Sequence, residues 1–290
     1  MTIDRPESSW NLLLSDLKAL TELAGTLVSA VPAGSFGFME IEEAGRNQDP
    51  SLERSVEGAH ESSHSLLVAS IDCTRQLGLL MERDPSSTVA GLGIVRAALE
   101  NAAVHQWLTE PSLSLERRAR RWEILQIEEA MHAKRSPREA NKQIGADLLA
   151  EVRERCEDRG WLVSATKRTV NKEGLPSPDD LIRPVMKRSD EPPRDEDLGG
   201  LRWWIWSGVA ATSIFGALQG PLHTPGALGH EAPCALADAV MLMVFCAHGL
   251  SVAVDRHLSL GDGESQRWND AMSRFQGRAI EAAQALSPLH

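Results

Sequence analysis

The stretch STVAGLGIVRAALENAAVHQWL, residues 87–108, is apolar around almost its whole circumference when it is drawn as a helix. A helix that is apolar on every side is normally buried. Pro85 precedes the segment and Pro111 follows it, and a helix cannot continue through either residue. We therefore predict a buried helix over residues 87–108.

Helical spacing of apolar residues continues on both sides of this segment. No segment alternates as a half-buried strand would, and the loop 31–50 contains glycine and proline. The sequence therefore predicts an all-α fold, a bundle of seven or eight helices. Besides residues 87–108, helices are predicted at 9–30, 51–83, 115–135, 137–159, 201–218, 234–258 and 264–286.

Residues 164–200 differ from the rest of the chain. They include NKEGLPSPDDLIRPVMKRSDEPPRDEDLGG, which is rich in proline and charge and has no helical period. We predict a long mobile loop or lid here. It would separate N-terminal helices (1–163) from C-terminal helices (201–290) that complete the same domain.

Composition and charge narrow the classes of function. The chain has 290 residues, is 42% hydrophobic and carries a net charge of −11. The one basic block is RRARRW, residues 117–122. A nucleic-acid or anionic-membrane binder needs a basic face, so we expect neither partner. The sequence also lacks the Walker, Rossmann and G-x-S-x-G motifs, which disfavours nucleotide-driven chemistry and serine hydrolysis.

Localisation is predicted from three features. The start MTIDRPESSW does not resemble a signal peptide, and the four cysteines are widely spaced without a CxxC motif. The segment CALADAVMLMVFCAHGLSVAV, residues 234–254, is long enough to span a bilayer, but it contains Asp238 and His248. We predict that it is a buried helix and that the protein is cytoplasmic.

Residues 58–64, GAHESSH, contain the H-E-x-x-H order of zinc metallopeptidases. His60 and His64 would bind zinc, and Glu61 would be the general base. On a helix, however, His60 lies about 70°, His64 about 110° and Glu61 about 170° from the centre of the apolar stripe. We interpret the motif as a polar helix flank and keep zinc as an alternative.

A second metal hypothesis is a di-iron site. The order Glu22, Glu61-x-x-His64, Glu100, Glu129-x-x-His132 resembles that of ferritin-like bundles. Counted from the break at Pro85, Glu61 and Glu100 differ in depth by about 10 Å along their helices. Absence of a cofactor is therefore the leading expectation, and di-iron remains an alternative.

Charged residues on apolar helix faces are the strongest functional signal. Arg96 and Glu100 are i,i+4 neighbours on the 87–108 helix and share a stripe with Trp107. On the next helix, Glu129 and His132 align with the apolar residues 115, 119, 122 and 125. Buried charges are costly unless they are paired. The sequence predicts a buried network of Arg96, Glu100, Arg118 or Arg121, Glu129 and His132.

Two functions fit such a network. In the first, an enzyme or binding protein uses it as a pocket for a small apolar or anionic ligand. His132 would be the acid or base, Glu129 or Glu100 would orient it, and the ligand would contact Arg96, Arg118, Arg121 and Trp107. In the second, the charges only specify packing in a non-catalytic homodimer, formed through the Trp-rich segment LRWWIWSG (201–208) or the 234–254 helix.

Three segments carry a family resemblance: RAALENAAVHQWL (96–108), ERRARRWEIL (116–125) and WWIWSGVAATSIFGAL (203–218). Together they resemble a group of uncharacterised all-helical proteins of high-GC bacteria. The resemblance implies a helical fold and the Arg96/Glu100 stripe, and it implies no activity. The chain departs from the group at Ala211, where the group has a histidine.

Overall fold

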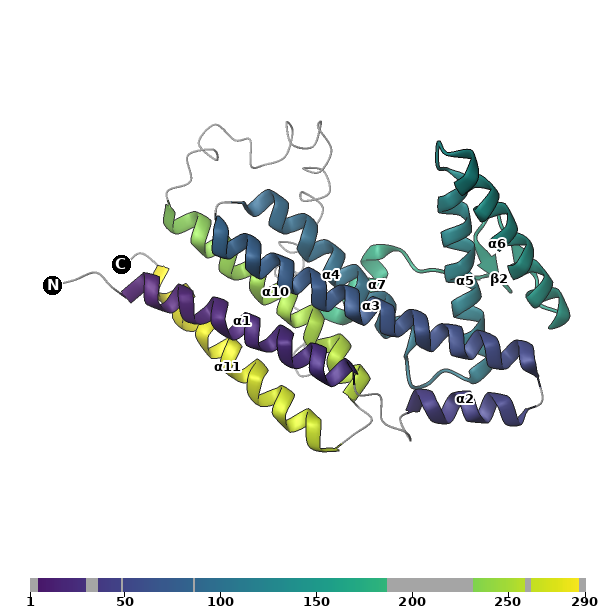
Figure 1. Cartoon of the computed structure of the whole chain (residues 1–290), viewed down its shortest axis with the longest axis horizontal. Helices are drawn as coiled ribbons and strands as arrows, with labels where there is room; N and C mark the ends of the chain where they lie inside the picture. Colours follow the sequence, from purple (N-terminus) through teal and green to yellow (C-terminus); the bar gives the residue numbers. More distant parts are fainter. Residues whose placement is uncertain are drawn as a thin grey trace. The chain divides into compact units, whose positions relative to one another are not determined.

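The computed structural model describes residues 5–29, 36–47, 49–85, 87–186, 232–258 and 262–286 (Figure 1). Within these ranges, the prediction of an all-α fold is confirmed. The elements are α1 (Arg5–Ser29), α2 (Phe36–Arg46), α3 (Pro50–Arg83), α4 (Thr88–Leu108), α5 (Leu115–Lys134), α6 (Glu139–Asp158), β1 (Val163–Ser164), β2 (Thr169–Val170), β3 (Glu173–Gly174), α7 (Pro178–Met186), α10 (Ala232–Leu258) and α11 (Asp262–Leu286).

The prediction of a loop over residues 31–50 was wrong for Phe36–Arg46, where α2 forms. Glycine and proline near the start of the segment suggested a loop. Tertiary contacts override that local signal, because α2 buries Ala44 in a core cluster together with Leu52 and Val56 of α3. Its Glu40 is also buried, in an ion pair described below.

The prediction of a loop over 164–200 was wrong for the described residues up to Met186. A small antiparallel sheet with strand order β1-β2-β3 forms, and α7 follows it. Asn171 and Lys172 connect β2 to β3 with φ angles of 49° and 68°, the left-handed conformation that tight hairpin turns require. Strands of two residues are too short to show an alternating pattern. Residues 187–200 and the predicted helix 201–218 lie outside the described residues.

Contacts between residues divide the chain into two compact units. The first comprises residues 1–31, 66–106 and 179–290. Its core includes α4, as predicted, and α10. Gly249 of α10 allows close approach to α4, because an added Cβ would lie 2.8 Å from Leu99 Cδ2. Nearby, the Thr74 hydroxyl lies 3.3 Å from the Cys246 sulfur.

The helix α10 contains a stretch, Ala239–His257, that is long and apolar enough to cross a membrane. The structure buries 56% of that stretch. This is compatible with a helix in the core of a soluble protein, and cytoplasmic localisation remains a prediction.

The second unit comprises residues 32–65 and 107–178 and holds the residues discussed below. Its centre is the packing of α5 on α6, with Ile124, Ile127 and Val152 fully buried. Gly145 of α6 lies against the backbone of α5, where an added Cβ would be 2.5 Å from the Ala130 carbonyl oxygen. A glycine is therefore required at this helix crossing. The α5 helix begins at Ser114, whose hydroxyl accepts a hydrogen bond from an N–H of the first turn.

Candidate functional site

A buried ion pair links α2 to α5. Arg118 contacts both carboxylate oxygens of Glu40, with Nε 2.6 Å from Oε2 and Nη2 3.0 Å from Oε1. His60 of α3 lies on the same carboxylate, with Nε2 2.8 Å from Oε2. Burial lowers the pKa of the Arg118 guanidinium, and the Glu40 charge opposes that effect. Glu40 is therefore held in place by two partners from different helices.

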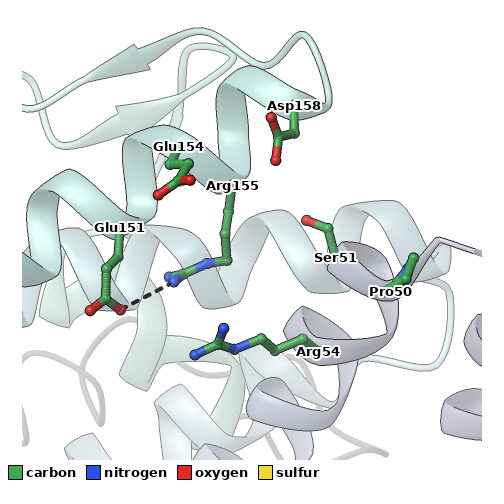
Figure 2. Close-up of a pocket in the computed structure, with 7 residues that line it drawn as sticks. All are labelled: Pro50, Ser51, Arg54, Glu151, Glu154, Arg155 and Asp158. Atoms are coloured by element: carbon green, nitrogen blue, oxygen red, sulfur yellow. Dashed lines mark ion pairs between the residues drawn. The ribbon is translucent and has the colours of Figure 1, made fainter.

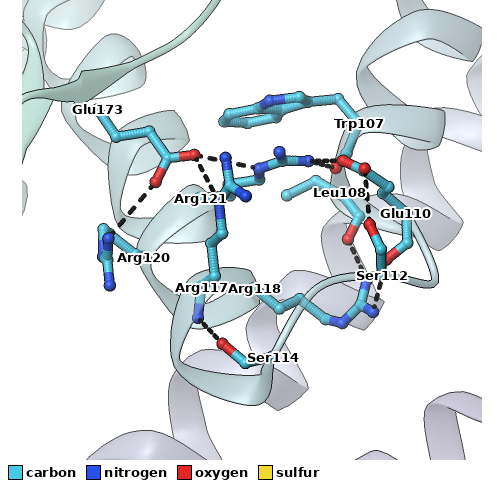
Figure 3. Close-up of polar contacts among 10 residues, drawn as sticks. All are labelled: Trp107, Leu108, Glu110, Ser112, Ser114, Arg117, Arg118, Arg120, Arg121 and Glu173. Atoms are coloured by element: carbon cyan, nitrogen blue, oxygen red, sulfur yellow. Dashed lines mark hydrogen bonds and ion pairs between the residues drawn. The ribbon is translucent and has the colours of Figure 1, made fainter.

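Two arginines of α5 also bind backbone carbonyls at the end of α4 (Figure 3). Arg118 donates to the carbonyls of Leu108 and Glu110, and Arg121 donates to the carbonyl of Trp107. The last carbonyls of a helix lack partners within that helix. Arg121 further pairs with the Glu110 carboxylate at 2.8 Å. These contacts give both arginines a structural role in the α4–α5 connection.

Three arginines on one face of α5 surround a single carboxylate (Figure 3). Glu173 of β3 lies 3.2 Å from Arg117, 3.6 Å from Arg120 and 3.4 Å from Arg121. The spacing i, i+3, i+4 brings these three residues to one side of the helix. Three of the four arginines in the block RRARRW thus form a basic face that β3 covers in part.

Tryptophans stack on several of these guanidinium groups. The Arg121 guanidinium carbon lies 4.9 Å from the centre of the Trp107 ring. Arg120 and Arg159 both lie over Trp161, at 5.5 and 4.8 Å. Such contacts restrict the conformations of the arginine side chains. Helical spacing predicts that Trp107 shares a stripe with Arg96 and Glu100, whereas the structure places it against Arg121.

Glu123 is a fully buried carboxylate that was not among the residues predicted from the sequence. It accepts two hydrogen bonds from Arg155, at 3.0 and 2.9 Å, and one from the Ser55 hydroxyl at 2.8 Å. Burial lowers the pKa of Arg155, but the hydrogen bonds and the attraction to Glu123 outweigh it, and the pKa is raised. One signal was present in the sequence, because Glu123 lies one turn from both Ala119 and Ile127.

A pocket of about 450 Å³ lies beside Arg155, between the start of α3 and the end of α6 (Figure 2). Figure 2 shows the side chains of α6 facing those of α3 across it. Its lining is polar and carries both signs of charge. The lining residues are Pro50, Ser51, Arg54, Glu151, Glu154, Arg155 and Asp158.

Three charges in this pocket are not neutralised within the described part of the chain. The side chains of Arg54, Glu154 and Asp158 form no hydrogen bond and no ion pair with any described residue. Arg155, in contrast, is paired with Glu123 and lies 3.6 Å from Glu151. The pocket therefore offers one cation and two carboxylates to a ligand.

The predicted buried network is not observed as a unit. Arg96 and Glu100 do form an ion pair, at 2.6 Å, but both are partly exposed and belong to the first unit. Glu129 and His132 belong to the second unit and are exposed. The prediction that both are buried was wrong because the C-terminal half of α5 packs on α6 through Ile127, on the opposite side of the helix.

Within the described residues, neither of the two metal sites considered from the sequence is assembled. His60 binds Glu40, and His64 is half-buried. Of the residues proposed for di-iron, Glu22, Glu61 and Glu129 are exposed. In the described ranges, no three His, Cys, Asp or Glu side chains are grouped so that they could hold a metal ion.

Comparison of the chain with protein-family models, with curated protein sequences and with solved structures found no match.

Proposed function

We propose that the protein binds a small zwitterionic ligand in the pocket between α3 and α6. The ligand would carry an ammonium or guanidinium group and a carboxylate or similar anionic group. The observation that supports this proposal most directly is the set of three unpaired charges, Arg54, Glu154 and Asp158, around one pocket. Charged side chains in a concave site bind ligands of complementary charge.

The arrangement on α6 favours a cationic group in the ligand. Glu154 and Asp158 are four residues apart, so their side chains lie on the same face of the helix. An ammonium group placed between them would donate hydrogen bonds to both carboxylates. Arg54 lies on α3, across the pocket, and would bind the anionic group of the same ligand.

The lining favours binding over nucleophilic catalysis. It contains one hydroxyl, that of Ser51, and neither histidine nor cysteine. His60, whose Nε2 lies 2.8 Å from the Glu40 carboxylate, does not line the pocket. An apolar ligand is disfavoured as well, because Pro50 is the one apolar residue of the lining.

Calorimetric titration of the full chain tests this proposal. The panel comprises lysine and γ-aminobutyrate as zwitterions, a simple amine, a simple carboxylate and inorganic phosphate. We expect a zwitterion to bind and expect the amine and the carboxylate alone to bind at least tenfold more weakly. Glu154→Gln and Arg54→Gln should each weaken binding by about tenfold or more, since a charge-assisted hydrogen bond contributes about 1.5–3 kcal/mol.

The matched control is Glu157→Gln on the same helix. Glu157 is exposed and does not line the pocket, so its variant should bind like the unmodified chain. The proposal is wrong if no zwitterion of the panel binds, or if Glu154→Gln and Glu157→Gln have the same affinity.

A further inference from the structure

We infer that Arg117, Arg120 and Arg121 form a binding site for a phosphate-type oxyanion, and that the Glu173 carboxylate occupies this site in the structure described here. The inference rests on the face of α5 and on β3. It shares no residue with the α3/α6 pocket, so it stands or falls independently of the proposed function.

The charges around Glu173 are unbalanced. Three guanidinium groups lie on the one carboxylate of Glu173. Among the described residues, only Arg121 has a second carboxylate partner, that of Glu110. Arg120 Nε is buried and has no hydrogen-bond partner in the described part of the chain. The three guanidinium groups thus carry more positive charge and more donors than the carboxylates of Glu173 and Glu110 can satisfy.

The distances show that Glu173 fits the three arginines imperfectly. Its oxygens lie 3.2, 3.4 and 3.6 Å from the nearest nitrogens of Arg117, Arg121 and Arg120. Well-formed charge-assisted hydrogen bonds of this kind are about 2.7–2.9 Å long. A phosphate presents more oxygens, arranged tetrahedrally, and can accept from all three guanidinium groups at once.

Two features prepare the site for a ligand. The rings of Trp107 and Trp161 stack on Arg121 and Arg120, which holds two of the three donors in place. Arg117 is half-exposed, with 52% of its side chain accessible, so that the site is open to solvent on its side.

The segment that carries Glu173 is strained. It follows Asn171 and Lys172, which have φ angles of 49° and 68°. Left-handed conformations cost energy in residues other than glycine, and asparagine tolerates them better than lysine. Movement of this turn would release Glu173 from the arginines and relax Lys172. An incoming oxyanion therefore competes with one carboxylate on a strained turn.

The experiment measures binding of pyrophosphate and inorganic phosphate to the full chain by calorimetry. In Glu173→Gln, the competing charge is removed but the shape of the side chain is kept. We expect the affinity for pyrophosphate to rise at least tenfold over that of the unmodified chain. Adding Arg117→Gln to that variant should reduce the affinity at least tenfold again.

The matched control is Glu116→Gln, which makes the same change of net charge at an exposed position on α5, the helix that carries the three arginines. If Glu116→Gln raises the affinity as much as Glu173→Gln does, binding reflects net charge alone and the inference fails. If binding to Glu173→Gln is unaffected by Arg117→Gln, the bound anion is an adventitious ion only, and the inference fails as well.

A second measurement covers the case in which Glu173→Gln does not fold. Arg117 is half-exposed, so Arg117→Gln should fold in the otherwise unmodified chain. Pyrophosphate at millimolar concentration should then raise the melting temperature of the unmodified chain and of Arg153→Gln, an exposed control on α6, but not that of Arg117→Gln. If pyrophosphate raises the melting temperature of all three proteins equally, or of none of them, the inference is overturned.

Discussion

Glu40 and Arg118 lie 78 residues apart in the sequence and form a buried two-point ion pair. The Arg118 side chain is only 1% exposed, and Glu40 also holds His60. Three helices, α2, α3 and α5, therefore meet at one carboxylate. Because both charges are buried, each depends on the other for neutralisation.

Removal of one partner of this pair should destabilise the protein strongly. Glu40→Ala leaves the Arg118 charge buried without its carboxylate, so we expect the free energy of unfolding to fall by about 3–5 kcal/mol. Urea denaturation measures the change. The control is Glu43→Ala on the exposed side of α2, which should change stability by less than about 0.5 kcal/mol. Equal effects of the two variants would contradict a central role of the Glu40–Arg118 pair.

The crossing of α5 and α6 should reject any side chain at Gly145. An added Cβ would lie 2.5 Å from the Ala130 carbonyl oxygen and 2.9 Å from Lys134 N, so the helices would have to separate. We expect Gly145→Ala to cost about 1–3 kcal/mol by thermal or urea unfolding.

Gly277→Ala is the matched control for that substitution. Gly277 lies in α11 and has nothing within 4 Å of an added Cβ. Alanine has the higher helix propensity, so this variant should be more stable by about 0.5–1 kcal/mol. A destabilising Gly277→Ala would show that the local environment of α11 differs from the one described.

The pairing of Arg155 with Glu123 should depend on the guanidinium group. Lysine keeps the charge of Arg155 but loses the two parallel hydrogen bonds and the stacking on Trp122, where the guanidinium carbon lies 5.0 Å from the ring centre. We expect Arg155→Lys to reduce the free energy of unfolding by about 2 kcal/mol. Arg153→Lys on the exposed face of α6 should have no measurable effect.

Stability should decrease at alkaline pH because of the buried thiol of Cys156. Burial raises the pKa of this thiol from 9.0 to about 12. A raised pKa means that the folded chain keeps the proton while the unfolded chain releases it. The contribution of the protonated Cys156 thiol to the free energy of unfolding is therefore fully present below pH 9 and is lost as the pH rises toward 12. The loss is at most about 1.4 kcal/mol per pH unit.

The measurement for this prediction is urea unfolding at pH 8, 9 and 10. Between pH 8 and pH 10, the free energy of unfolding should decrease less in Cys156→Ala than in the unmodified chain, whatever the stability of the variant at pH 8. Cys246, whose pKa burial also raises to about 12, continues to contribute in both proteins. If the free energy of unfolding falls equally steeply with pH in the two proteins, Cys156 does not titrate as described.

Much of the helical fold could be predicted from residue spacing. The breaks at Asp84–Pro85 and before Leu115 delimit α3, α4 and α5 within a residue or two of the predicted bounds. The α2 helix and the β1–β3 sheet could not be predicted, because α2 depends on burial of Ala44 and Glu40 by other elements and the strands have only two residues each.

The candidate site was predicted less well than the fold. Arg118, Arg121 and Trp107 were recognised as residues with polar or aromatic contacts in the interior, and the structure places all three in the second unit. Their partners were assigned wrongly. The apolar face of α5 was extrapolated from its N-terminal half to Glu129 and His132, but α6 covers the other side of the helix there.

By itself, the sequence determined where the chain forms its long helices, because apolar spacing and proline breaks act over a few neighbouring residues. Only the tertiary structure decided which charges neutralise one another. Glu40 and Arg118, or Glu123 and Arg155, are distant in sequence, and nothing in the local pattern of either residue specifies its partner. The same applies to the pocket, since its lining comes from α3 and α6, and a ligand site depends on which side chains the packing leaves without partners.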